Sequence, residues 1–341
     1  MKKIILIILV LLTFGVCTAQ NVTNCAFRQV NKKVEVTYNL DKTANISLLV
    51  STDGGKTFST PLKHVTGDVG NNVTAGNKTI IWDALAEVDK IVGSQIVFKV
   101  TAEPKIGKQT FRVNGVSFTM VYVQGGTFTM GAHDNQLTNV SESEKPAHSV
   151  TLSSFAIGET EVTQALWVAV MGNNPSEYEG NILRPVEYIS WNDCQEFIRK
   201  LNSLTGKNFR MPTEAEWEFA ARGGNNSHGY KYSGSNNIDD VAWYDSNSEG
   251  QTHPVKQKQP NELGLYDMTG NVLEWCSDWY GSYSSSYQTN PKGPSTGYYR
   301  LCRGSSWRGD SWTCRSSYRY GNYPDNRGKS SQRGLRLALS E

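Results

Sequence analysis

Two carboxylates bracket a tight turn late in the sequence, and their spacing suits a metal ion. Asp267 and Glu274 lie seven residues apart, with Gly270 between them. A glycine turn of this kind aims backbone carbonyls inward, and a hard cation such as Ca²⁺ takes six or more oxygen ligands. The pattern therefore predicts calcium binding at this turn. The alternative is that the carboxylates only cap the turn and pair with arginines.

A second candidate site is the stretch from 308 to 329, which is dense in Arg, Tyr, Trp, Asn, Asp and Ser. Such side chains combine adaptable hydrogen bonding with rigid aromatic area, the composition of a recognition surface. The alternative is a loop that only packs against its own neighbours. We predict a ligand-binding surface, for a protein or a glycan, formed by Arg308, Asp310, Trp312, Tyr318, Arg319 and Tyr320.

Histidine and cysteine predict no further metal site. The five histidines are scattered, without the short spacings of a helical metal pair. The five cysteines after the predicted signal peptide are an odd number and form no Cys-x-x-Cys pair, so neither a zinc knuckle nor a disulfide framework is indicated. Two readings stay open for Cys302 and Cys314: a disulfide between them, or separate buried thiols.

The first nineteen residues are typical of a signal peptide. Lys2 and Lys3 precede an apolar run from 4 to 16, and small residues follow before Gln20. We expect cleavage there and export to the periplasm or the cell surface. No later stretch approaches the roughly 18 apolar residues of a transmembrane helix, so no membrane-spanning segment is expected.

The rest of the chain divides into two domains. The first occupies 20–104. From 30 to about 102 apolar and polar residues alternate with period two, as in Val34, Val36, Tyr38 and Leu40, and Gly/Asn turns separate the runs. This predicts a small all-β, immunoglobulin-like sandwich. A polar linker follows at 105–111, and a second domain occupies 112–341.

The second domain has few long helical patterns. Helices are expected at 163–171, at 191–204 and from Thr213 onward, with Gly-, Asn- and Trp-rich loops between them.

The charges of the whole chain are nearly balanced, with 34 Lys and Arg against 32 Asp and Glu. A formal net charge of +2 is too small to attract nucleic acid, so nucleic acid is not expected as a partner. Paired charges around Trp217 are expected to form a structural lattice; they are Arg210, Glu214, Glu216 and Arg222.

Short segments spread over 112–341 carry a family resemblance. They occur in order at 125–131, 161–163, 186–193, 210–224, 261–275, 303–307 and 334–336. Together they resemble the formylglycine-generating enzyme, or sulfatase-modifying factor, family. The resemblance implies an irregular α+β fold related to C-type lectins, with a groove that in the family's enzymes binds a sulfatase peptide and oxidises its cysteine with copper and oxygen. It implies as calcium ligands Asp267, Gly270, Val272 and Glu274.

The catalytic residues of that family are only partly present here. The family's copper site uses two cysteines five residues apart, because two thiolates hold a soft Cu(I) ion. Gly309 stands at the first position, Cys314 stands about at the second, and Leu273 replaces the active-site Trp. We therefore expect no copper and assign no catalytic residue, with Ser306 and Cys314 as vestigial candidates.

These observations favour an exported cell-envelope protein whose calcium-stabilised domain binds a protein or glycan without catalysis. One alternative is a metal-dependent oxidoreductase of the family, which converts peptide cysteine to formylglycine. Another is a structural component of an envelope or secretion complex, since relatives of this fold serve so in gliding bacteria. Fold alone does not choose among them.

Overall fold

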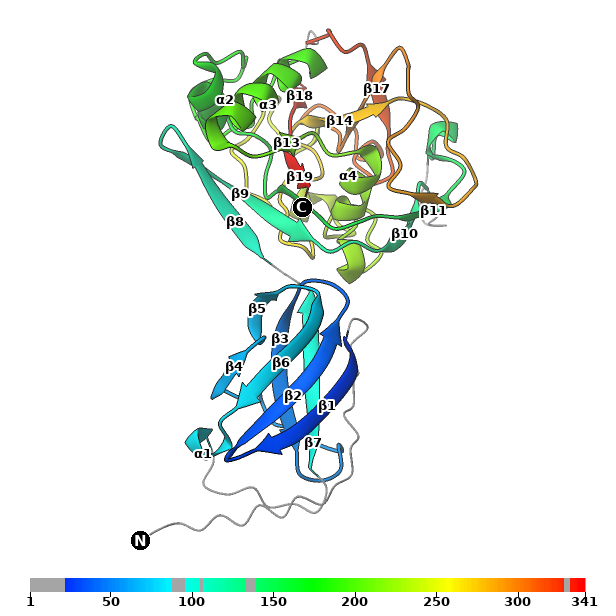
Figure 1. Ribbon diagram of the computed structural model, residues 1–341. Coiled ribbons are helices and arrows are strands. Elements are labelled where there is room, and N and C mark those ends of the chain that lie inside the picture. The colour runs from blue at the N-terminus through cyan, green and yellow to red at the C-terminus, as the bar shows by residue number, and fades with distance from the viewer. Residues whose placement is uncertain (1–21, 88–95, 105–106, 133–138, 328–331, 341) are drawn as a thin grey trace. The chain divides into compact units, whose positions relative to one another are not determined.

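The computed structural model divides the chain into two compact units, Met1–Ile106 and Gly107–Glu341 (Figure 1). It describes residues 22–87, 96–104, 107–132, 139–327 and 332–340. The predicted signal peptide and the first two residues of the predicted linker lie outside the described residues. Among the helices that are described, none has the length and apolar character needed to cross a membrane.

The N-terminal unit contains two antiparallel sheets, of strand order β1-β2-β6-β4 and β5-β3-β7. A short helix, α1 (Ala84–Glu87), follows β6. The strands are β1 (Val22–Val30), β2 (Lys33–Leu40), β3 (Ala44–Ser51), β4 (Val65–Gly67), β5 (Gly70–Val73), β6 (Gly76–Trp82) and β7 (Val97–Pro104).

Period-two alternation gives the two sheets one shared core. In β2 the residues Val34, Val36, Tyr38 and Leu40 are buried, while those between them are partly exposed. Their buried neighbours come from strands of both sheets, and the ring of Phe98 on β7 meets Trp82 on β6 edge to face at 5.7 Å. Since successive strand residues face opposite sides, this alternation follows directly from the sequence.

The C-terminal unit is a mixed helix and sheet structure with three sheets. Their strand orders are β13-β19-β12-β9-β8, β17-β16-β14-β18 and β10-β11-β15. The strands are β8 (Lys108–Val113), β9 (Val116–Val123), β10 (Thr127–Met130), β11 (His148–Thr151), β12 (Phe155–Gly158), β13 (Phe209–Arg210), β14 (Leu273–Trp279), β15 (Gln288–Thr289), β16 (Arg300–Arg303), β17 (Tyr320–Asn322), β18 (Arg333–Gly334) and β19 (Ala338–Ser340).

Helices of this unit begin at side-chain caps that the sequence contains. Ser190 and Asp193 form a capping box at the start of α3 (Trp191–Thr205), and Thr213 and Glu216 form another at α4 (Glu214–Ala221). These starts confirm the helices expected there. The remaining helical segments are α2 (Gln164–Met171), α5 (Ile238–Val241), and the 3-10 turns η1 (Glu142–Glu144) and η2 (Gly224–Asn226).

Four cysteines of the C-terminal unit are free, buried thiols: Cys194, Cys276, Cys302 and Cys314. Cys302 packs in the core beside Cys194, whereas Cys314 packs in a separate small cluster with Tyr232 and Val241. The disulfide considered between Cys302 and Cys314 is therefore absent, and the reading as separate buried thiols holds.

Candidate functional site

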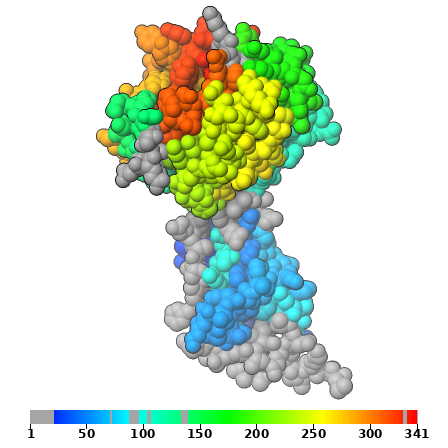
Figure 2. All heavy atoms as spheres, turned by 180° about the vertical axis from the view of Figure 1, so that it is seen from behind, coloured from blue at the N-terminus to red at the C-terminus, as the bar shows by residue number. Residues whose placement is uncertain are grey.

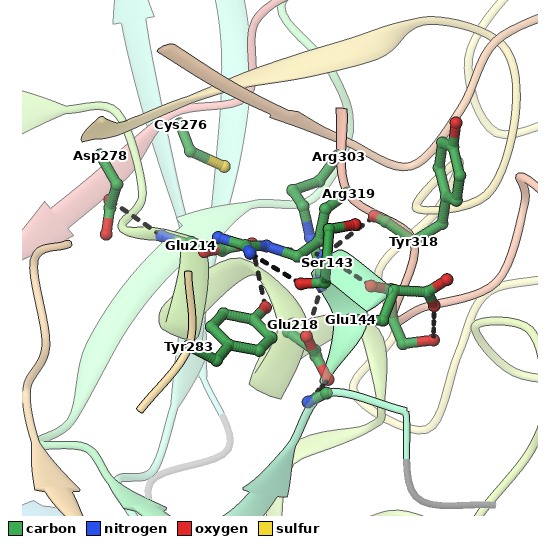
Figure 3. Close-up of polar contacts among 12 residues, drawn as sticks. Ser143, Glu144, Glu214, Glu218, Cys276, Asp278, Tyr283, Arg303, Tyr318 and Arg319 are labelled. Atoms are coloured by element: carbon green, nitrogen blue, oxygen red, sulfur yellow. Dashed lines mark hydrogen bonds and ion pairs between the residues drawn. The ribbon is translucent and has the colours of Figure 1, made fainter. Parts of the chain in front are cut away.

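A lattice of buried ions lies beneath the 303–320 segment (Figure 3). Glu214 and Glu218 lie one turn apart on α4, and Arg303 ends β16. The fully buried Arg303 pairs with Glu218 and lies 3.4 Å from Glu214. Arg319 donates Nε to Glu214 Oε1 at 2.6 Å and Nη2 to Oε2 at 2.8 Å. Each carboxylate is thus held by guanidinium groups, the condition under which buried charges are tolerated.

The pKa values in this lattice follow from the pairing. Burial alone lowers the pKa of Arg303, but the charges of Glu218, Tyr283 and Glu214 together outweigh burial and the pKa is raised. Burial likewise raises the pKa of Glu218, but Arg222 and Arg303 outweigh it and the pKa is lowered. Arg303 and Glu218 therefore both stay ionised near neutral pH.

The same lattice fixes the backbone of the loop above it. Arg303 donates to the carbonyl oxygens of Ser316, Ser317 and Tyr318 at 2.7–2.9 Å. A second buried pair joins Arg315 Nη2 to Glu144 Oε1 at 2.7 Å. Residues 315–319 are thereby anchored from below, so the side chains on the outer side of the loop are held in place.

Side chains of the 308–321 loop line one wall of an open pocket of about 370 Å³, here called the aromatic pocket. Residues around 310, orange in Figure 2, reach the surface of the C-terminal unit. Trp312 and Tyr320 are 36% and 37% exposed. The pocket is lined by Ser141, Ser143, Tyr280, Tyr299, Trp312, Tyr318, Arg319, Tyr320 and Gly321.

The structure brings together four of the six residues predicted to bind a ligand, namely Trp312, Tyr318, Arg319 and Tyr320. Arg308 and Asp310 are not among the residues that line the pocket. Asp310 instead accepts a hydrogen bond from Trp312 Nε1 at 3.2 Å.

Five lining residues were not singled out from the sequence, and one of them, Gly321, directly follows the predicted Tyr320. Tyr280 and Tyr299 come from the regions of β14 and β16, and Ser141 and Ser143 lie at η1, far from 308–320 in the chain. The density of tyrosine around 280–299 was a signal for the first two. Nothing in the local sequence connects the two serines to this loop.

A second cavity, of about 360 Å³, lies on another side of Arg319 and is here called the acidic pocket. Asp278, Glu214, Tyr283 and His148 are among its lining residues. Tyr283 donates its hydroxyl to Glu214 Oε1 at 3.1 Å. Burial, and after it the charge of Glu214, raises the pKa of Asp278 to about 7. No motif or spacing in the sequence groups these residues.

The position of the first copper cysteine, Gly309, has no room for a side chain as the loop is built. A Cβ atom there would lie 2.0 Å from Ser305 Oγ and 2.8 Å from Thr313 Oγ1. These two hydroxyls hydrogen-bond each other at 2.6 Å. Cys314 is 1% exposed, and burial raises the pKa of its thiol to about 12. A copper-binding thiolate is therefore disfavoured at 314 near neutral pH.

The two other family positions are also enclosed. Ser306 is 2% exposed, and its Oγ accepts a weak hydrogen bond from the backbone N–H of Arg308 at 3.4 Å. Leu273 is 6% exposed and belongs to the main apolar core. Arg308 lies near Tyr178, whose pKa is raised chiefly by burial, with the charge of Arg308 as a smaller opposing cause.

The predicted calcium turn carries an excess of buried negative charge. Asp267, Glu274 and the nearby Glu161 are each at most 3% exposed, and Arg336 is the guanidinium that faces them. Burial, and next the charges of Asp267 and Glu274, raise the pKa of Glu161 well above its usual range. Burial is also the main cause that raises the pKa of Asp267 to about 6. This charge balance fits a bound cation.

The carboxylate oxygens at this turn are only partly available to coordinate such a cation, because several of them already accept hydrogen bonds. Glu274 accepts from Trp217 Nε1 at 2.5 Å and from Arg336 Nε and Nη2 at 2.6–2.9 Å, so both its oxygens are engaged. Asp267 Oδ2 accepts from the backbone N–H of Lys256 at 2.8 Å. No group of three or more His, Cys, Asp or Glu side chains among the described residues is arranged to hold a metal. A calcium site here would thus depend on Asp267 and on backbone carbonyls of Gly270 and Val272.

Comparison with known proteins decides the family. Residues 109–341 match the model of the sulfatase-modifying factor enzyme 1-like domain. The chain belongs to this family. It is 34% identical over 276 residues to the chaperone protein LppX of Paenibacillus barcinonensis, covering 66% of this chain and 91% of that protein. It is 30% identical to the formylglycine-generating enzyme of Streptomyces coelicolor, covering 64% of this chain and 88% of that enzyme.

A solved structure agrees with that assignment. Treponema denticola variable protein 1 superposes with a TM-score of 0.63 at 35% identity, covering 69% of this chain and 99% of that one. In the sulfatase-modifying factor domain of the present chain, the aromatic pocket and the buried lattice are both formed within the matched region.

Proposed function

We propose that this chain is an exported cell-envelope protein whose sulfatase-modifying factor domain binds a ligand and does not oxidise cysteine. The single observation that carries the binding function is the convergence of Trp312, Tyr318, Arg319 and Tyr320 on one surface pocket. Rigid aromatic side chains anchored on a fixed loop lose little entropy on binding, which favours recognition.

Position 309 supports the absence of the oxidase reaction. Cu(I) held by two thiolates needs a cysteine where this chain has Gly309, and the Ser305 hydroxyl occupies the space of that side chain. The remaining thiol, Cys314, is buried and has a raised pKa. The free cysteine Cys302 packs in another cluster, so it does not supply a second thiolate.

The finer features belong to the same proposal. The leader-like residues 1–19 support export. The shared core of two antiparallel sheets supports an immunoglobulin-like N-terminal domain that spaces or docks its neighbour. The loop-rich C-terminal unit is proposed to be C-type-lectin-like. The surplus carboxylates around Asp267 support calcium as a structural ion.

Metal binding and peptide oxidation test this proposal together. The mature protein, purified without chelator, is offered Ca²⁺ and Cu(I), and a cysteine-containing sulfatase peptide is followed by mass spectrometry under oxygen. We expect calcium to raise the melting temperature of the C-terminal unit by binding the folded state, with no conversion of peptide cysteine. Asp267→Ala is expected to remove the calcium effect, and Lys292→Ala, an exposed change elsewhere, is its control.

Two results of this experiment would contradict the absence of cysteine oxidation. Copper bound in a fixed ratio to the chain, and lost in Cys314→Ala, would contradict the proposal, as would conversion of the peptide cysteine to formylglycine. Calcium without any effect on melting would remove the calcium part of the proposal alone.

A further inference from the structure

We infer that the aromatic pocket recognises an uncharged glycan. This inference rests on the proposed binding function and names the chemical class of the ligand. The pocket's volume of about 370 Å³ lies in the range of small-ligand sites. One tryptophan, four tyrosines and two serines are among the residues that line it.

Charge in the pocket disfavours an anionic ligand. Of the described residues that line it, Arg319 carries the one formal charge. Its guanidinium already donates two bonds to Glu214 and further bonds to the carbonyl oxygens of Ser143 and Gly281 at 2.8 and 2.9 Å. Four of its five N–H groups are therefore used, and its charge is balanced. A phosphate or carboxylate would find no unpaired cation here.

A cationic ligand is disfavoured by the cations that the rings already contact. The guanidinium of Arg319 lies 4.8 Å from the ring centre of Tyr280, and that of Arg333 lies 5.8 Å from the ring centre of Tyr320. Aromatic rings attract a cation through the negative charge of their faces. Two rings of this pocket thus already contact arginines of the chain itself, and no carboxylate among the lining residues would compensate a further positive charge.

A neutral sugar ring matches what remains. Its C–H groups form an apolar face with partial positive charge, which suits the negative face of an aromatic ring. Its hydroxyl rim both donates and accepts, as do serine and tyrosine hydroxyls. Trp312 and Tyr320 present the exposed ring area for stacking, and Ser141 and Ser143 stand at the rim.

The rings are held ready for such a ligand. Trp312 meets Tyr318 edge to face at 5.5 Å with an interplanar angle of 90°, and its Nε1 bonds Asp310. Tyr299 meets Tyr323 at 4.7 Å. The buried pairs of Arg303 and Arg315 fix the backbone beneath them. Because little freedom is lost on binding, a weak stacking ligand gains affinity.

The test uses the full mature chain and a panel of uncharged oligosaccharides built from glucose, mannose, galactose and N-acetylhexosamine. Binding is followed by titration calorimetry and by intrinsic tryptophan fluorescence, and the part of the fluorescence change that is lost in Trp312→Phe is assigned to Trp312. We expect at least one of these glycans to bind, with an affinity that is unchanged between low and high salt because no ion pair forms. A decaproline peptide, inorganic phosphate and choline are the comparison probes.

Variants separate the pocket from the rest of the surface. Trp312→Ala and Tyr320→Ala are expected to weaken glycan binding about tenfold or more, by loss of ring contact. Trp312→Phe keeps a ring and is expected to retain most of the affinity. Tyr287→Ala is the matched control, since Tyr287 is 60% exposed and does not line the pocket. Circular dichroism checks that each variant is folded.

Each negative result has one meaning. If the decaproline peptide binds in a Trp312-dependent manner and no glycan of the panel does, the glycan inference is wrong and the proposed binding function stands. If no probe of any class binds in a way that depends on Trp312 or Tyr320, the inference and the binding function both fail. Glycan binding that survives both alanine variants places the site elsewhere and overturns the inference.

Discussion

In the N-terminal unit the shared core of the two sheets is apolar, and the described part of that unit buries no charged side chain. The C-terminal unit is different, because Arg303, Arg315 and Arg336 are among its largest fully buried side chains. Regular strands satisfy their own backbone groups, so apolar packing is sufficient for the first unit. Long irregular loops leave carbonyls without such partners, and buried arginines supply the donors.

Among the changes that test this difference between the units, removal of Arg303 is expected to have the largest effect on stability. Arg303→Met keeps the length of the side chain but removes the donors to Glu218 and to three carbonyls of the loop. Breaking a buried ion pair costs about 3–5 kcal/mol, so the C-terminal unit should unfold at much lower denaturant. Separate calorimetric transitions of the two units provide the measurement.

The matched control is Arg28→Met, since Arg28 pairs with Glu35 at the exposed surface of the N-terminal unit. It should leave both transitions in place. If Arg303→Met leaves the C-terminal transition unchanged as well, the lattice does not stabilise this unit, and the contrast between the units disappears.

The corresponding change in the N-terminal unit is a loss of apolar packing. Leu48 is fully buried on β3, and Leu48→Ala is expected to lower the stability of this unit by about 2–5 kcal/mol through lost burial and a cavity. The C-terminal transition should not move. Val30→Ala, at a partly exposed residue, is the control. A shift of both transitions would show that the units unfold together, contrary to the comparison.

The smallest predicted effect is the part of the pH dependence of the C-terminal unit that comes from Asp278. Asp278 has a pKa of about 7 in the folded protein against 3.8 as its reference value, so the folded state keeps a proton that the unfolded state releases. Its stabilising contribution is complete below about pH 4 and is lost as the pH rises toward 7, at no more than about 1.4 kcal/mol per pH unit.

Asp278→Asn tests that sign, because the amide resembles the protonated carboxyl. Its C-terminal transition should lose less stability between pH 4 and 7 than that of the parent chain, as measured by denaturant unfolding at each pH. An equal loss in both proteins would rule out Asp278 as the source. Asp325→Asn, at an exposed residue of the same unit, serves as the control.

Local sequence patterns were sufficient to predict the strands and helices whose formation depends on alternation and capping residues within a short segment. The alternation at 34–40 gave strand β2, and the capping residues Ser190 and Thr213 gave the starts of α3 and α4. The motifs of the C-terminal region were specific enough for the family, and the matched residues 109–341 confirm it.

The predicted site was harder to obtain from the sequence. Density of aromatic residues singled out Trp312, Tyr318 and Tyr320, which do share a pocket. The prediction from composition also included Arg308, which does not line the pocket. It treated Arg319 as a surface residue, although Arg319 is only 5% exposed. Composition indicates which side chains are suited to recognition, but it does not say which of them a loop turns outward.

What the sequence determined by itself was the set of local elements and the family, since strand alternation, caps and short motifs act over a few residues. The tertiary structure alone decided which carboxylate meets which guanidinium, and hence which face of the 303–320 loop is open. Glu144 and Arg315 are 171 residues apart in the chain and 2.7 Å apart at their charged atoms. Pairing across such separations depends on how loops cross, and local sequence does not encode it.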